Sequence, residues 1–108
     1  MARPKSRPPT RKLKLLTAFR CVKEGAVTST GFGRTLNIGD SQVMLESPDA
    51  FPVGQALVLE FLLDNDQVAQ ARGHVTRITK GKDLYRVRVE FDKLPARTRR
   101  LLARQVAG

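Results

Sequence analysis

Tryptophan is absent from this 108-residue chain, and cysteine and histidine occur once each, as Cys21 and His74. A single cysteine cannot form a disulfide within the chain, and these two residues together cannot assemble a zinc cluster. The longest apolar runs fall far short of the roughly 20 residues that a membrane-spanning helix needs. The N-terminus is basic and lacks the apolar stretch of a secretory signal, so we expect a cytoplasmic protein with no membrane insertion.

Acidic residues are also scarce relative to basic ones. The chain has 10 acidic and 20 basic side chains, which give a formal net charge of +10. Much of the excess lies in residues 1–14, which contain no acid and hold Arg3, Lys5, Arg7, Arg11, Lys12 and Lys14. A charge excess of this size predicts an anionic partner.

The first residues also contain Pro4, Pro8 and Pro9, which prevent both a helix and a central strand. We therefore predict a flexible basic arm over residues 1–11. The length fits a single domain, which we place over residues 12–108.

Short segments with alternating polarity make up most of that domain. A period of two is the pattern of a β-strand with one buried face. The expected strands are Lys12–Cys21, Phe32–Ile38, Val43–Glu46, Gln55–Leu63, Gln67–Thr79 and Leu84–Phe91. Turn-forming residues lie between several of them, notably at Lys23–Gly25 and Asp64–Asp66. Six short strands joined by turns predict an all-β fold, as an antiparallel barrel or sandwich.

The period changes near the C-terminus. Pro95 suits the first turn of a helix. Residues on one side at helical spacing are Leu94, Thr98, Leu101, Leu102 and Gln105, and the arginines that face mostly outward are Arg97, Arg99, Arg100 and Arg104. This pattern predicts a short amphipathic α-helix from about residue 95 that covers one end of a barrel.

Two local patterns accompany this order of elements. Arg7 and Arg11 form an R-x-x-x-R sequence just before the first expected strand, and Asn37–Gln42 lies between the second and third. The order and these segments resemble the PilZ domain family, in which R-x-x-x-R precedes the first strand and an Asp/Asn-x-Ser-x-x-Gly motif follows the second. Later segments that resemble the family are Phe51–Leu57, Gly73–Arg77 and Val89–Leu94. The resemblance implies a six-stranded antiparallel PilZ-like β-barrel with a short C-terminal α-helix.

The same resemblance implies a function. PilZ domains are bacterial signalling modules that bind the second messenger cyclic di-GMP, so we expect a small receptor or adaptor with this ligand and an unidentified protein partner. An arginine can bond phosphate oxygens or the guanine edge with its planar fork. The residues that the resemblance assigns to the ligand are Arg7, Arg11, Asn37, Gly39 and Gln42. Ser41, two residues after Gly39, is a further candidate because it carries a hydroxyl.

The second motif departs from the family pattern. Gly39 stands where the family has serine, and Gln42 stands where it has glycine. Gly39 lacks a hydroxyl, which removes a hydrogen bond worth about 0.5–1.5 kcal/mol. Gln42 adds bulk where glycine would give room or a positive φ. These departures favour an alternative, a PilZ-like adaptor that no longer binds cyclic di-GMP and acts through protein contacts.

A third hypothesis is non-specific binding of nucleic acid, which the basic arm and the C-terminal arginines would suit. The scarcity of aromatic residues makes a base-stacking platform difficult to build. No pairing of a nucleophile with a base and no metal-ligand spacing stands out, so we expect neither an enzyme nor a cofactor. His74 is interpreted as an ordinary strand residue and Cys21 as a small core residue.

Overall fold

The computed structural model describes residues 11–107. The strands are β1 (Arg11–Lys12), β2 (Leu16–Lys23), β3 (Ala26–Ile38), β4 (Gln42–Ser47), β5 (Ala56–Leu62), β6 (Val68–Lys80) and β7 (Tyr85–Lys93), and the helix is α1 (Ala96–Ala107). Of the arm predicted over residues 1–11, only Arg11 lies within the described residues, so the mobility of the arm stays a prediction.

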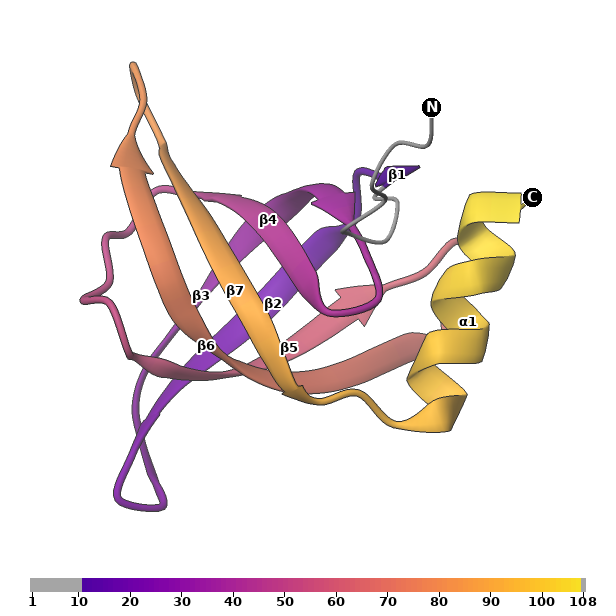
Figure 1. The fold of residues 1–108 in the computed structure, drawn as a ribbon, viewed down its shortest axis with the longest axis horizontal. Coiled ribbons are helices and arrows are strands. Elements are labelled where there is room, and N and C mark those ends of the chain that lie inside the picture. The colour runs from indigo at the N-terminus through magenta and orange to yellow at the C-terminus, as the bar shows by residue number, and fades with distance from the viewer. Residues whose placement is uncertain (1–10, 108) are drawn as a thin grey trace, which may run out of the picture.

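The seven strands form one antiparallel sheet in the order β1-β3-β2-β5-β6-β7-β4, and an additional pairing of β3 with β4 closes it into a barrel (Figure 1). The barrel wall is made by β2 to β7, while β1 lies beside β3. The prediction of a six-stranded antiparallel barrel is therefore confirmed, and β1 is an addition to it. Full closure leaves β2 to β7 with no unpaired edge, which protects them from pairing with other chains.

Alternating residues of the strands point inward and form the core. Side chains that are almost completely buried there are Phe19, Val43, Leu45, Leu57, Leu59, Phe61, Val75, Val87 and Val89. Phe19 packs edge to face against Phe51, with ring centroids 5.1 Å apart and an interplanar angle of 85°. Cys21 is buried beside them as expected. Burial of each large apolar side chain contributes about 1.5–3 kcal/mol, so this alternation is the main reason for the fold.

The strand predicted at Phe32–Ile38 is β3, and it is longer than its sequence pattern indicated. It begins at Ala26 instead of Phe32, and the residues from Ala26 to Thr30 are exposed. They belong to a β2–β3 hairpin that projects beyond the barrel (Figure 1). Glu24 and Gly25 both have positive φ, 51° and 81°, as a tight hairpin turn requires. The early part of β3 was missed because a strand without a buried face has no alternation to detect.

The first strand also differs, because the predicted Lys12–Cys21 strand is interrupted between β1 and β2. The buried Thr35 explains the break: its hydroxyl accepts a hydrogen bond of 2.8 Å from the Leu15 amide and donates one to the Leu13 carbonyl. These side-chain bonds add to two backbone bonds in the break, from the Thr35 amide to the Leu15 carbonyl (3.0 Å) and from the Leu13 amide to the Leu36 carbonyl (3.3 Å). Regular pairing with β3 resumes at Arg11 and Lys12.

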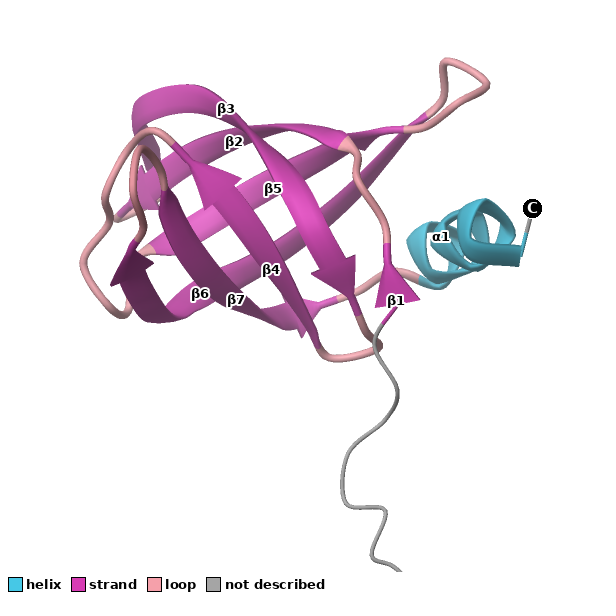
Figure 2. Ribbon diagram, turned by 90° about the horizontal axis from the view of Figure 1, so that it is seen from above, coloured by secondary structure: helices cyan, strands magenta, loops and turns pink. Residues whose placement is uncertain are grey.

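The α1 helix lies at one end of the barrel, as predicted (Figures 1 and 2). Thr98 is buried and its hydroxyl donates a 2.6 Å hydrogen bond to the Gln70 carbonyl of β6. Leu102 is buried in the core, whereas the helix arginines are exposed. Gln105 also accepts a hydrogen bond of 3.1 Å from the Asp64 amide in the β5–β6 turn. The amphipathic pattern thus fixes which side of α1 contacts the barrel.

Candidate functional site

Pairing of β1 with β3 places the end of the R-x-x-x-R sequence beside the Asn37 segment. Arg11 lies opposite Ile38 and Lys12 lies opposite Asn37 in antiparallel register. Just after β1, the Leu13 amide donates a 3.3 Å hydrogen bond to the Leu36 carbonyl. Figure 2 shows β1 next to the end of β3, where the chain turns into β4. Arg11 is therefore adjacent to the Asn37 segment in the fold, and Arg7 lies outside the described residues.

The predicted turn between the second and third strands is a tight hairpin. The Gly39 amide donates a 2.8 Å hydrogen bond to the Gln42 carbonyl, which leaves Asp40 and Ser41 exposed at the tip. The Ser41 carbonyl accepts a 2.9 Å hydrogen bond from the Phe91 amide of β7. The backbone of this turn is therefore held by β7 as well as by its own strands.

The structure shows that glycine at position 42 would have supplied room and not a positive φ. Within residues 11–107, positive φ is found at Glu24, Gly25, Gly54 and Asp66 only. Gln42 begins β4 with ordinary strand geometry and pairs with Glu90. Its side chain adds bulk beside the turn without straining the backbone.

Strand register extends the site across the outside of the barrel. Lys12 pairs with Asn37, Asn37 with Met44, Met44 with Arg88, and Arg88 with Arg77. Ile38, Val43 and Val89, the chain neighbours of Asn37, Met44 and Arg88, are buried. Arg77 is exposed after the bulge that follows Val75, so the whole row faces outward. Adjacent strands lie about 4.8 Å apart, so the five residues span roughly 19 Å. We call these five residues the outer row.

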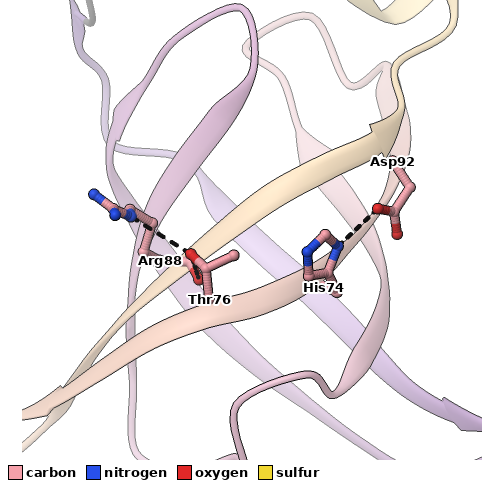
Figure 3. Close-up of polar contacts among 4 residues, drawn as sticks. All are labelled: His74, Thr76, Arg88 and Asp92. Carbon is pink, nitrogen blue, oxygen red and sulfur yellow. Dashed lines mark hydrogen bonds and ion pairs between the residues drawn. The ribbon is translucent and has the colours of Figure 1, made fainter.

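A second row lies beside the outer row and contains Gln42, Glu90 and His74. His74 Nδ1 lies 2.7 Å from Asp92 Oδ1, an exposed contact that joins β6 to β7 (Figure 3). No carboxylate lies near His74 along the chain, because Asp92 is 18 residues away and reaches it only through strand pairing. Exposed pairs of this kind add about 0–1 kcal/mol to stability, so this one mainly orients the two side chains.

The outer row carries concentrated positive charge. Arg77 and Arg88 occupy directly opposite positions on β6 and β7, and like charges so placed destabilise a sheet. Arg88 Nε donates a 3.5 Å hydrogen bond to the Thr76 hydroxyl (Figure 3). The ion pairs formed among the described residues, Arg20–Glu60 and His74–Asp92, involve neither arginine of this row. The guanidinium groups of Arg77 and Arg88 therefore remain available to an anion.

Sequence reasoning missed Lys12, Met44, Arg77 and Arg88 as members of the site. The alternation of Arg86 and Arg88 with buried valines does place them on the outside of a strand. It does not say that β7 lies beside β4, because strand order is not encoded in a local pattern.

Other kinds of site are not evident in the part of the chain that the structure describes. Residues 11–107 contain no cluster of three or more histidine, cysteine, aspartate or glutamate side chains suited to a metal ion. Within the described residues, the α1 helix is too short and too polar to cross a membrane.

Comparisons with known proteins give a family match and a solved structure with a similar fold. The family model described as "PilZ domain" matches residues 15–108. A solved structure with a similar fold is that of the Bacillus subtilis inhibitor of motility (MotI/DgrA), with a TM-score of 0.74 and 15% sequence identity. The alignment covers 96% of this chain and 50% of that one, so this chain spans half the length of the motility inhibitor. A search of curated proteins finds no match.

Proposed function

The chain belongs to the PilZ domain family, and on this basis we propose that it is a cyclic di-GMP receptor that acts as a small adaptor without catalytic activity. The family match begins at Leu15 and therefore does not include the R-x-x-x-R sequence. The case for a ligand rests on the residues themselves.

The observation that carries the proposal is the pairing of β1 with the end of β3. It aligns Arg11 with Ile38 and Lys12 with Asn37, so an arm that continues from β1 begins at the Asn37–Gln42 turn. A dianionic ligand on the outer row would meet cations from β1, β6 and β7. Phosphate oxygens and guanine edges are both good partners for arginine, because the guanidinium fork donates two parallel hydrogen bonds.

We assign roles to the site residues on this chemistry. Arg7 and Arg11 bind the phosphates or a guanine edge from the arm, and Asn37 offers an amide that can donate and accept hydrogen bonds. Gly39 contributes backbone only, and the exposed Ser41 hydroxyl lies at the tip of the turn. The Gln42 side chain takes up room beside the turn that the ligand would occupy. The affinity for cyclic di-GMP is therefore lower than that of a PilZ domain with a complete motif.

Signalling by such a module needs a change that a partner can detect. Closure of the arm over the ligand would neutralise positive charge on the outer row and cover part of the barrel. A partner that contacts the arm or the row would then respond to the nucleotide. The motility inhibitor with the similar fold is named for its effect on motility. For this chain, the output we propose is regulation of a protein partner.

Titration calorimetry with cyclic di-GMP tests the proposal. Replacement of Arg7 or Arg11 by alanine should weaken binding roughly ten- to a hundredfold, because each loses charge-assisted hydrogen bonds worth about 1.5–3 kcal/mol. Arg3→Ala is the matched control: it removes the same charge but lies farther from the barrel, so its effect should be smaller.

Unchanged affinity in both Arg7→Ala and Arg11→Ala would exclude the arm as the binding element. If the wild-type protein fails to bind at high micromolar nucleotide while Gly39→Ser with Gln42→Gly binds, the protein is instead an adaptor that has lost its ligand.

A further inference from the structure

A second charged surface lies on the outside of β2, β5, β6 and β7. Strand register places Arg20 opposite Val58, Val58 opposite Arg72, and Arg72 opposite Lys93. These residues line a shallow groove of about 140 Å³ that Pro95 borders beside the start of α1. The small Val58 between two long cationic side chains explains the hollow. The groove shares no residue with the outer row.

The charge of this groove is only partly balanced. Arg20 contacts the Glu60 carboxylate at 3.5 Å, and Glu60 also accepts a 3.0 Å hydrogen bond from Gln70. Arg72 and Lys93 form no ion pair with any residue in the range 11–107, and they lie directly opposite each other. Facing like charges weaken a sheet unless an anion lies between them. Glu60 shows that a carboxylate fits this environment.

Exposed apolar side chains lie on the same face, separated from the groove by the cross-strand pair Glu60–Gln70. Leu62 and Val68 pair across β5 and β6 and are 43% and 45% exposed. Leu16 is 50% exposed, and the register of Thr17 with Phe61 places it beside Leu62. Val68 lies four residues before Arg72 on β6, roughly 13 Å away. Arg97 of α1 reaches the same end, where Nη1 donates to the Val68 carbonyl at 3.5 Å.

We propose that this face docks an acidic segment of a partner protein, with carboxylates in the groove and apolar side chains on the patch. We call it the β5–β6 face, and it comprises Leu16, Arg20, Leu62, Val68, Arg72 and Lys93. An apolar patch bordered by arginines is the composition of a protein interface. A small phosphate would leave the leucines and the valine exposed, and a nucleic acid backbone would gain nothing from them.

Direct binding of a defined peptide tests this. The probe is a fluorescein-labelled peptide of glutamate and leucine, about twelve residues long, which as a helix spans roughly 18 Å and so covers groove and patch. Fluorescence anisotropy is measured near physiological salt in the absence of nucleotide. Arg72→Gln with Lys93→Gln should weaken binding at least about tenfold, since two charge-assisted contacts are lost. Val68→Ser should weaken it severalfold.

The matched control is Lys80→Gln with Lys82→Gln, which removes the same charge from exposed positions at the far end of the β6–β7 hairpin. It should change the affinity less than about threefold, because screening limits charges farther away than about 8–10 Å. Equal weakening by the two double variants would reduce the interaction to net charge and overturn the proposal. So would an undiminished affinity for a peptide with serine in place of leucine, or no binding by the wild-type protein.

The nucleotide proposal is tested separately on the same variants. Cyclic di-GMP affinity should stay within about twofold when Arg72 and Lys93 are replaced, because neither side chain lies in the outer row. If nucleotide affinity falls together with peptide affinity, the groove belongs to the nucleotide site and the separate docking surface is refuted. The peptide titration itself needs no nucleotide, so its outcome stands whether or not the receptor proposal holds.

Discussion

Replacement of Thr35 by valine should uncouple β1 from the barrel while preserving the shape of the core. Thr35 is fully buried, and its hydroxyl bonds both the Leu15 amide and the Leu13 carbonyl. Valine has nearly the same volume but neither donates nor accepts. Since Leu15 is only 5% exposed, its amide would lose its partner in a place that water reaches poorly.

The expected loss of stability follows from that stranded amide. A buried donor left without a partner costs about 1–3 kcal/mol. A middle value of about 2 kcal/mol corresponds to a fall in Tm of roughly 8–16 °C for a domain of this size. The half-buried Leu13 carbonyl can be hydrated, so it should add little. Because residues 13–15 connect β1 to β2, β1 should lose its register with Asn37.

Thermal unfolding followed by circular dichroism, with Thr35→Ser as the matched control, measures this effect. Serine keeps the hydroxyl and loses one buried methyl group, so it should cost only about 1 kcal/mol. If the receptor proposal is right, Thr35→Val should also weaken cyclic di-GMP binding more than Thr35→Ser does. Equal stability of the two variants, or a more stable valine variant, would refute the role of the hydroxyl.

Three further perturbations test other parts of the structure. Gly73→Ala would place a Cβ atom 2.3 Å from the Glu90 carbonyl oxygen, so β6 and β7 must separate and stability should fall by about 1–3 kcal/mol or more in urea titrations; a neutral effect would contradict the close approach. Leu102→Ala should cost about 2–5 kcal/mol, because Leu102 anchors α1 in the core, whereas Ala103→Ser on the exposed side should be neutral. Gly39→Ser with Gln42→Gly should tighten cyclic di-GMP binding severalfold in calorimetry, and weaker binding would show that the motif is not merely degraded.

The barrel was largely predictable because its strands each have one buried face. Alternation from Tyr85 to Phe91 or from Ala56 to Leu62 reports burial directly, and the strands observed there agree with those expected within one or two residues. Alternation fails where burial is absent, which is why the start of β3 at Ala26 was missed. It also could not reveal the break after Lys12, since that depends on a bond from Thr35, which is distant in sequence.

The candidate site was predicted only in part. The spacing of Arg7 and Arg11 and the turn from Asn37 to Gln42 are local features, and the order of strands around them indicated the family. Arg88 and Arg77 could not be assigned, because their membership depends on β4 lying beside β7 and β7 beside β6.

The sequence by itself determined the number of barrel strands, the amphipathic C-terminal helix and the basic character of the chain. Each follows from periodicity or composition, which act over a few neighbouring residues. Only the tertiary structure decided that Lys12, Asn37, Met44, Arg88 and Arg77 form one row, and that Arg72 faces Lys93 beside an apolar patch. Strand order and register bring together residues that are far apart along the chain, and they are set by how the whole barrel closes around its core.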